Sequence, residues 1–307
     1  MKKRLLSGLL AAAVLLALAP AALAASVPAQ DEVAQVLAAL DIMVGDENGN
    51  LNLGSTVTRA EFAKLSVAAT PAGDAVGDTV SISPYPDVPK TNWAAPWIKA
   101  AVDQGLVKGN LHGYFEPNRT ITLAEGVTIA LRLLGYQDSD FTGVWPAGQM
   151  AQYRALKLDV GVTCGTNDAM SRKDAMYLFY NLMTAASKTT GTYYINTLEP
   201  GMVNAAGEID RVALINSAME GPVVAEGNWQ SQIPFNVNTA KVYRGGASST
   251  LSAVQNLDVV YWSESMRTIW AYNNKATGTY EKASHSASAT TSVTVAGKTY
   301  AIENTAA

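Results

Sequence analysis

The sequence is poor in the residues that build disulfides and metal centres. Its 307 residues include one cysteine, Cys164, and two histidines, His112 and His285. A single cysteine allows no internal disulfide. Two distant histidines argue against a His-rich metal cluster and against a Ser-His-Asp triad, and no phosphate-binding glycine loop occurs. We therefore expect no catalytic residue, no metal and no cofactor in this chain.

Long apolar runs are also missing, except at the N-terminus. Residues 1–24 contain a basic start (Lys2, Lys3, Arg4), an apolar run over 5–19 and a final small-x-small triplet. This pattern is typical of a secretory signal peptide. The run is too short and wrongly flanked for a convincing membrane span. We expect cleavage after Ala24 and a secreted protein without a membrane span.

Positive charge is in deficit. The chain has 22 Lys and Arg against 26 Asp and Glu, for a formal net charge of −4, and three of the basic residues belong to the signal peptide. This acidic balance argues against nucleic acid as a partner. Any acidic polymer must be attracted by local charge, because the overall field opposes it.

One acidic stretch, residues 46–52, resembles a calcium loop at first sight. It carries Leu51 where such a loop has its glycine and Val57 where it has its last acidic ligand. We therefore expect no calcium site there.

What the chain does contain is an internal repeat. Three similar tetrapeptides occur at residues 58–61 (Thr-Arg-Ala-Glu), 122–125 (Thr-Leu-Ala-Glu) and 171–174 (Ser-Arg-Lys-Asp). The first two follow Gly45 and Gly109 at equal distances, and the third follows Gly161 at a distance three residues shorter. Trp93 and Trp145 precede their glycines by equal distances as well. Recurring offsets of this kind indicate repeated structural units.

Each copy has the pattern of a helix, a loop and a second helix. In copy two, apolar residues at three- and four-residue spacing predict helices over about 94–104 and from Thr122 onward. The loop between them is rich in Gly, Asn and Pro. In copy three the first helix is predicted at about 150–158. One helix pair cannot bury its apolar face alone, so the three copies should pack on each other.

The tetrapeptides predict helix caps. Capping boxes are expected for Thr58 with Glu61 and Thr122 with Glu125, and a weaker version for Ser171 with Asp174. A cap does not require arginine, and a cation at a helix start costs about 0.3–1 kcal/mol. Arg59 and Arg172 therefore either bind an anion beside the free N–H groups of the helix start or pair with a neighbouring carboxylate. The sequence leaves both interpretations open.

These motifs, with the segment Tyr-Pro-Asp-Val-Pro-Lys-Thr-Asn-Trp-Ala at 85–94, resemble the S-layer homology (SLH) domain. The match continues through residues 97–107, Phe115 and Pro117, and covers about residues 30–187. The resemblance implies a pseudo-threefold helical bundle whose grooves bind an anionic secondary cell-wall polysaccharide, commonly one with pyruvylated N-acetylmannosamine. It thus implies non-covalent anchoring to the bacterial cell wall or S-layer.

The resemblance also implies ligand-binding residues, namely Arg59, Arg172, Asp87, Trp93 and Gly109. The chain departs from the family pattern in three places. Leu123 replaces the motif arginine in copy two, copy one lacks a tryptophan segment before its first helix, and Asn92 stands where the family usually has histidine. We therefore expect one or two working grooves rather than three.

The chain is expected to be a multidomain α + β protein. We expect a signal peptide at 1–24, SLH repeats at 25–72, 84–137 and 138–187, and a small antiparallel β domain at 192–307. The β assignment rests on short β-branched and aromatic runs separated by turn residues. These runs lie at 193–195, 209–215, 241–243, 259–262 and 268–272. Hairpins are predicted for 258–263 with 267–272, and for 292–295 with 299–302.

The β domain leaves alternatives open. Its aromatics Tyr261, Trp262, Trp270 and Tyr272 form either a sugar-stacking face or core and cross-strand pairs. The strand at 300–303 lies four residues from the end, which suggests a fragment of a longer protein or an edge that recruits another chain. Wall anchoring is the main hypothesis. The alternatives are an SLH-anchored enzyme that acts on surface polysaccharide through carboxylates, and a self-assembling S-layer subunit.

Overall fold

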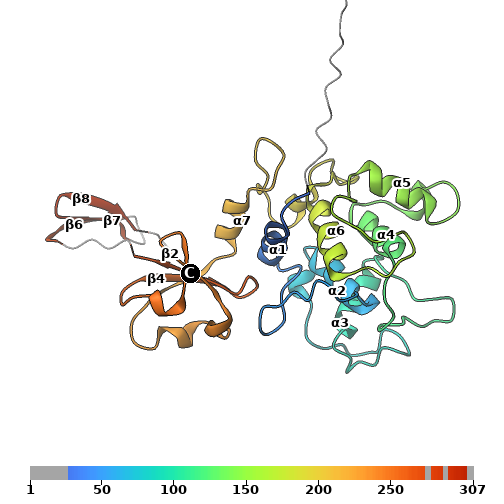
Figure 1. Cartoon of the computed structure of the whole chain (residues 1–307), viewed down its shortest axis with the longest axis horizontal. Helices are drawn as coiled ribbons and strands as arrows, with labels where there is room; N and C mark the ends of the chain where they lie inside the picture. Colours follow the sequence, from blue (N-terminus) through green and yellow to red (C-terminus); the bar gives the residue numbers. More distant parts are fainter. Residues whose placement is uncertain (1–26, 274–277, 286–289, 303–307) are drawn as a thin grey trace, which may run out of the picture.

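The chain folds into a helical part and a β part that lie side by side (Figure 1). The computed structural model describes residues 27–273, 278–285 and 290–302, so the predicted signal peptide lies outside the described residues. The helices are α1 (Gln30–Ala39), α2 (Arg59–Ala68), α3 (Ala95–Asp103), α4 (Leu123–Leu133), α5 (Ala147–Ala155), α6 (Arg172–Thr184) and α7 (Arg211–Ser217). None of the helices in these ranges is long and apolar enough to cross a lipid bilayer.

Helices α1 to α6 form three helix pairs that close into a ring. The second helices of the pairs, α2, α4 and α6, meet in the centre, where the rings of Phe62 and Phe179 lie 5.3 Å apart. Each first helix packs on the second helix of the preceding pair: α3 on α2, α5 on α4, and α1 on α6. The three copies thus pack on each other, as the repeats predicted, in the pseudo-threefold helical arrangement that the family resemblance implied.

Three backbone hydrogen bonds close the centre of the ring. The amide of Val57 donates to the Met170 carbonyl at 2.9 Å, Met170 donates to Ile121 at 2.9 Å, and Ile121 donates to Val57 at 3.0 Å. All three residues are buried, and each immediately precedes the cap of an inner helix. Because buried amides need partners, the starts of α2, α4 and α6 are fixed relative to one another.

The β part contains a five-stranded sheet and a three-stranded sheet. The first has the order β1-β4-β5-β2-β3, made of β1 (Glu220–Val224), β2 (Lys241–Arg244), β3 (Ala247–Ser249), β4 (Val259–Ser263) and β5 (Thr268–Tyr272). The second has the order β6-β7-β8, made of β6 (Tyr280–His285), β7 (Thr290–Val295) and β8 (Lys298–Ala301). Both predicted hairpins, β4 with β5 and β7 with β8, are confirmed.

Three details of the β prediction are wrong. The sheet is mixed rather than antiparallel, because β2 runs parallel to β5. Residues 194–197 form a 3₁₀ turn instead of a strand, and the Tyr194 hydroxyl donates to the Ala69 carbonyl at 2.7 Å. The run at 209–215 belongs to α7, since the Asp210 side chain caps the helix at Ala213 and Leu214 is fully buried. Consequently the first strand begins only at Glu220.

The two faces of the five-stranded sheet have different environments. Side chains alternate between faces along a strand. One face supplies a second core with Val242, Val260, Trp262, Ile269 and Ala271. Tyr261, Trp270 and Tyr272 lie on the opposite face, where the rings of Tyr261 and Tyr272 make an edge contact at 5.9 Å. The structure thus assigns Trp262 to the core and the other three aromatics to the outer face.

Candidate functional site

The inner helices begin with the predicted caps. Thr58 with Glu61, Thr122 with Glu125 and Ser171 with Asp174 all form complete capping boxes. The first two amides of each helix donate to loop carbonyls of the next repeat. Arg59 donates to Arg119 at 2.9 Å, and Arg172 donates to Ser55 at 2.8 Å. The expectation of free N–H groups for an anion is therefore wrong, and any anion must be held by side chains.

The guanidinium of Arg59 is fully occupied by contacts within the protein. Its Nε donates to the Phe115 carbonyl at 2.8 Å, a terminal nitrogen donates to Lys108 O at 3.1 Å, and the other lies 3.5 Å from the Glu125 carboxylate. The guanidinium also lies over the Phe115 ring, 4.8 Å from its centroid. Burial lowers the pKa of Arg59. Of the two open interpretations, pairing with a carboxylate is the one found for Arg59.

Glu125 links this arginine to a second one. Arg119 donates to Glu125 at 2.6 Å, and the same carboxylate accepts the Thr122 amide. Burial acts to raise the pKa of Glu125, but the hydrogen bonds from Arg119 and Thr122 outweigh it, so the pKa lies below its usual range. The carboxylate is therefore ionised at neutral pH and holds both arginines.

Arg172 occupies the matching position in α6, but its side chain makes fewer contacts within the protein. Its Nε donates to the Leu51 carbonyl at 2.7 Å, and Leu51 corresponds in the repeat to Phe115. Within the described part of the chain, no carboxylate lies within 4.0 Å of Arg172 and its two terminal nitrogens make no hydrogen bond. The backbone bond fixes the direction of the guanidinium and leaves its outer fork for a ligand.

The Arg172 side chain lines a groove of about 300 Å³ to which all three repeats contribute. Copy one supplies Lys64, copy two supplies Trp93 and Trp97, and copy three supplies Arg172. Trp93 is 56% exposed, and the Lys64 ammonium lies 5.5 Å from the centre of the Trp97 ring. The remaining lining residues are Asp41, Ile42, Met43, Val44, Glu61 and Leu65. We call this site the Arg172 groove.

The two matching positions in the bundle are closed by internal contacts. Beside Arg59, the residue that matches Lys64 is Thr128, which accepts a hydrogen bond from the Trp145 indole at 3.1 Å. At the third position Leu123 is buried in the core, and Tyr177, the counterpart of Lys64, donates to the Pro28 carbonyl at 3.1 Å. Among the described residues, the Arg172 groove alone combines an unpaired arginine, a lysine and an exposed tryptophan.

Asp87 and Gly109 lie elsewhere, under the loop that holds Arg59. The two oxygens of Asp87 accept the amides of Phe115 at 2.9 Å and Glu116 at 2.7 Å. The Gly109 amide donates to the Tyr85 hydroxyl at 2.9 Å, and a Cβ at Gly109 would lie 2.5 Å from the Tyr85 ring. The structure therefore brings Arg172 and Trp93 together, but places Asp87 and Gly109 as supports of the Arg59 loop.

Sequence reasoning overlooked Lys64 and Trp97 as groove residues. A signal existed for Lys64, because the repeat places Thr128 and Tyr177 at the matching positions, so this charge is particular to copy one. Trp97 lies in α3, four residues after Trp93, and its ring faces Lys64 of α2. Its place in the groove depends on the packing of α3 on α2, a contact between two repeats.

Across residues 27–273, 278–285 and 290–302 no group of three or more His, Cys, Asp or Glu side chains is placed to hold a metal ion. Asp46 instead accepts the amides of Asn48 and Asn50, each at 2.9 Å, and so forms a turn. Burial raises the pKa of Cys164 to about 12, so its thiol stays protonated at neutral pH.

Comparison with known proteins decides what this ring of helices is. The model of the S-layer homology domain matches residues 24–63 and 84–125. These two segments are SLH repeats. The third repeat lies outside the matched residues, but it shares the capping box and the central hydrogen bond with the other two.

Its relatives are proteins of the bacterial cell surface. The chain is 31% identical over 191 residues to the "Middle cell wall protein" of Brevibacillus brevis, and the alignment covers 59% of this chain and 18% of the relative. It is 33% identical over 168 residues to the "Surface layer protein" of Brevibacillus choshinensis, covering 52% and 15%. It is also 28% identical over 102 residues to an "Endoglucanase" of a Bacillus species, covering 33% and 10%.

The chain spans less than a fifth of the length of these relatives. Its SLH repeats and its similarity to cell-wall and surface-layer proteins indicate a secreted protein associated with the cell wall, with a role in wall anchoring or the surface layer. The similarity extends to an enzyme as well, so family membership by itself does not decide whether the whole protein is catalytic.

Proposed function

We propose that this protein is anchored non-covalently to the cell wall by binding an anionic secondary wall polysaccharide in the Arg172 groove. The ligand we favour carries a carboxylate, such as the pyruvyl group of pyruvylated N-acetylmannosamine. The observation that carries the proposal is the free outer fork of Arg172 beside exposed Trp93. A planar guanidinium matches a carboxylate in geometry and charge, and an aromatic face suits the ring of a sugar.

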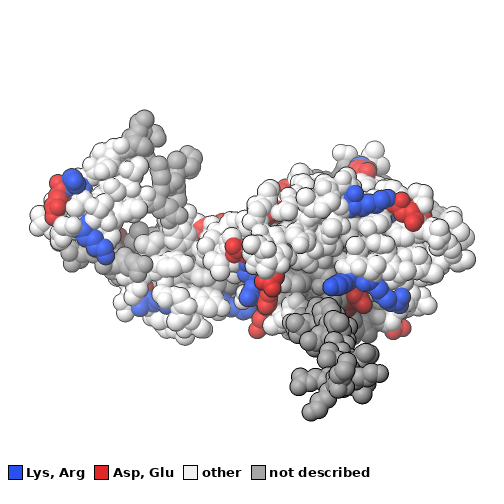
Figure 2. All heavy atoms as spheres, turned by 90° about the horizontal axis from the view of Figure 1, so that it is seen from above, with Lys and Arg blue, Asp and Glu red and all other residues white. Residues whose placement is uncertain are grey.

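Local charge supports the proposal. Charged side chains cover little of the face in Figure 2, and basic and acidic ones are interspersed there. The net charge of −4 repels an acidic polymer as a whole. Attraction therefore has to come from Arg172 and Lys64 within the groove. Binding through partly exposed cations should weaken as salt increases.

The test is a pull-down of the mature chain on purified cell-wall sacculi, before and after the secondary polysaccharide is stripped. We expect binding that is lost with the polysaccharide. The Arg172→Ala variant should bind about 10- to 100-fold more weakly, because a hydrogen-bonded charge contributes about 1.5–3 kcal/mol. The matched control is Arg154→Ala, which removes an exposed arginine of α5.

Three outcomes would count against the proposal. Equal binding to stripped sacculi would point to peptidoglycan as the ligand. Unchanged binding by Arg172→Ala would remove the groove assignment, and no binding by the unaltered chain would refute the anchor function. The alternative of an SLH-anchored enzyme is tested in the same samples, because release of reducing sugar from the sacculi would reveal a hydrolase.

A second candidate function is self-assembly, which the two edge strands of the three-stranded sheet favour. Among the described strands, β6 and β8 each pair with β7 alone. An edge strand offers unpaired backbone groups to another chain. Light scattering of the purified mature chain over a concentration series would test this function, since a strictly monomeric chain would count against it.

A further inference from the structure

The Arg172 groove is the first of three neighbouring hollows, the last of which lies against the five-stranded sheet. The groove shares Asp41, Val44 and Lys64 with a second hollow of about 600 Å³. That hollow shares Gly45, Ser265 and Arg267 with a third of about 410 Å³, which lies between α1 and the sheet. We call the third hollow the junction cavity. Since neighbouring hollows share lining residues, the three adjoin one another along the surface.

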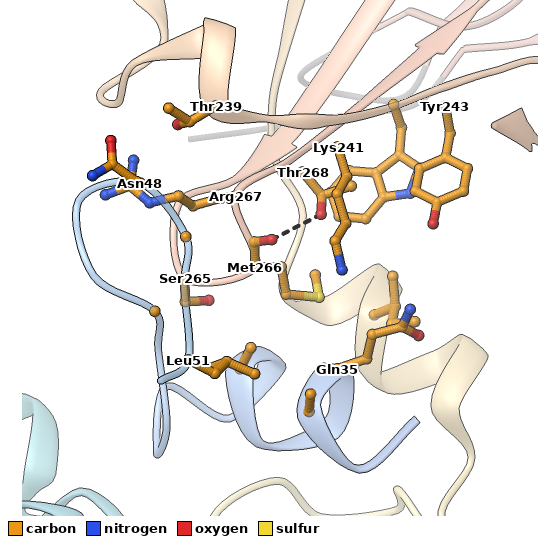
Figure 3. Close-up of a pocket in the computed structure, with 16 residues that line it drawn as sticks. Gln35, Asn48, Leu51, Thr239, Lys241, Tyr243, Ser265, Met266, Arg267 and Thr268 are labelled. Atoms are coloured by element: carbon orange, nitrogen blue, oxygen red, sulfur yellow. Dashed lines mark hydrogen bonds between the residues drawn. The ribbon is translucent and has the colours of Figure 1, made fainter. Parts of the chain in front are cut away.

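The junction cavity joins side chains from both parts of the chain (Figure 3). Helix α1 contributes Gln35, and the loop after it contributes Asn48. From the sheet side, the Lys241 side chain extends into the open space towards Gln35, and Arg267 reaches towards Asn48. A cavity of this size with a few polar groups around an aromatic surface is typical of a small-ligand site.

The aromatic surface comes from the register of the sheet. Tyr243 of β2 is paired with Trp270 of β5, and Lys241 with Thr268. Paired residues lie on the same face, so two aromatic rings and a lysine line the junction cavity. The β core uses the opposite face. Tyr243 and Trp270 are only partly buried, which leaves ring surface for a ligand.

Both cations of the junction cavity are free of carboxylate partners. Neither Lys241 nor Arg267 takes part in an ion pair within the described ranges, and Arg267 rests against Phe235 with its guanidinium 5.8 Å from the ring centre. The hollow between the two ends is more acidic, because Asp41, Glu220 and Glu264 line it together with Lys64 and Arg267. The junction cavity is thus lined by two cations and no carboxylate. The Arg172 groove sets Arg172 and Lys64 beside Asp41 and Glu61, and carboxylates outnumber cations only in the hollow between the two ends.

This charge pattern identifies a class of ligand. A polymer with an anionic group on every unit would meet carboxylates in the middle hollow, where like charges repel. A polysaccharide with acidic groups separated by neutral sugars would place anions at Arg172 and at Lys241 with Arg267, and hydroxyl groups between them. Aromatic surfaces at both ends suit sugar rings.

We propose that the junction cavity is a second saccharide subsite, and that one acidic polysaccharide chain runs from the Arg172 groove to Lys241 and Arg267. This inference rests on the proposed function, because it extends the same ligand. It makes the β part a contributor to wall binding, held against α1 by α7 and by the ion pair between Arg211 and Glu32 at 3.4 Å.

The test uses the full chain and polysaccharide released from purified sacculi, separated into a long fraction and a di- to trisaccharide fraction. The test variant is Lys241→Ala/Arg267→Asn. Asparagine is chosen because Arg267 has a φ of 46°, a conformation that asparagine tolerates better than alanine. Lys282→Ala, an exposed lysine of β6, is the matched control. Circular dichroism verifies that each variant is folded.

We expect the double variant to bind the long fraction at least about tenfold more weakly and the short fraction as the unaltered chain does. Arg172→Ala should weaken binding of both fractions. Equal affinity of the double variant and the unaltered chain for the long fraction would overturn the second subsite while leaving the anchor function intact. No binding of either fraction by the unaltered chain would overturn both proposals.

A second polymer tests the charge argument. Polygalacturonate, which is charged on every unit, should bind more weakly than the long fraction, and tighter binding of it would contradict that argument.

Discussion

Arg59 and Arg172 occupy the same position in matching helices, yet only Arg59 has a carboxylate, Glu125, at ion-pair distance. Both side chains donate through Nε to the corresponding loop carbonyl, of Phe115 and of Leu51. The difference comes from the second repeat, in which Arg119 draws Glu125 beside Arg59. Arg59 is thereby tied to the rest of the protein, whereas the outer fork of Arg172 has no protein partner among the described residues.

The two arginines should therefore respond differently to removal. Arg59→Ala should lower the free energy of unfolding by about 1.5–3 kcal/mol, because it leaves the buried side of Glu125 and two carbonyls without their donor. Arg172→Ala should lower the free energy of unfolding by only about 0.5–1.5 kcal/mol, the net contribution of one hydrogen bond. It should, however, weaken wall binding more than Arg59→Ala does. Urea unfolding and sacculus binding would measure the two effects. The reverse order of effects would show that the ligand occupies the Arg59 side of the bundle.

Asp87 offers a test of a supporting residue. Asp87→Asn would turn an NH₂ group towards one of the two amides that the carboxylate now accepts. We expect the free energy of unfolding to fall by about 1–3 kcal/mol, with wall binding per folded molecule unchanged. Chemical denaturation, with Asp103→Asn on the exposed side of α3 as the control, would measure the loss. If the variant were fully stable but failed to bind sacculi, Asp87 would be a ligand residue after all.

The ring and its caps could be predicted from the sequence because they depend on local chemistry that recurs in each copy. Thr58 and Glu61 make the same two hydrogen bonds as Thr122 and Glu125, and the tetrapeptide is enough to predict them. The groove could not be predicted to the same depth. Its Lys64 and Trp97 meet only because α3 packs on α2, which is a contact between repeats.

The errors in the β part have a similar cause. The run at 209–215 has strand-like composition, but Asp210 caps a helix there and the helix packs on α1, so tertiary packing overrides propensity. The pairing of β2 with β5 joins segments far apart in the chain, and nothing in either segment encodes its direction. Adjacent hairpins, by contrast, were predicted correctly because a short turn fixes the pairing.

Lys64 is the one basic residue among the three matching repeat positions, and it lines the Arg172 groove. We therefore expect its charge to contribute to ligand binding. Lys64→Thr copies the residue found at the matching position beside Arg59, Thr128. We expect wall binding to fall about 3- to 10-fold, in line with a partly exposed charge contributing about 1 kcal/mol. Lys99→Thr on the exposed side of α3 serves as the control. Equal losses in both variants would mean that overall charge, rather than the groove, governs binding.

Leu123 tests whether the second repeat has exchanged binding for packing. It stands where the other copies have arginine, and its side chain is 3% exposed in the core. Leu123→Ala should lower the free energy of unfolding by about 2–5 kcal/mol because it leaves a cavity. Wall binding measured well below the unfolding temperature should stay unchanged. A selective loss of binding without loss of stability would show that this third position takes part in ligand recognition.

Acid should unfold the bundle partly through Glu125. Its pKa in the folded protein is lowered, since the hydrogen bonds from Arg119 and Thr122 outweigh the effect of burial. The pKa of an unfolded glutamate is about 4.3. A carboxyl with a lowered folded pKa contributes its full stabilisation above the unfolded value and loses it as the pH falls through the folded value. The free energy of unfolding should therefore decrease from about pH 5 towards pH 3, and the decrease should be smaller in Glu125→Gln, which starts from a lower stability at pH 7.

The control is Glu226→Gln, at an exposed site after β1. If Glu125→Gln had the same pH profile as the unaltered chain, its ion pairs with Arg59 and Arg119 would not stabilise the fold, and the structural role assigned to Arg59 would have to be withdrawn.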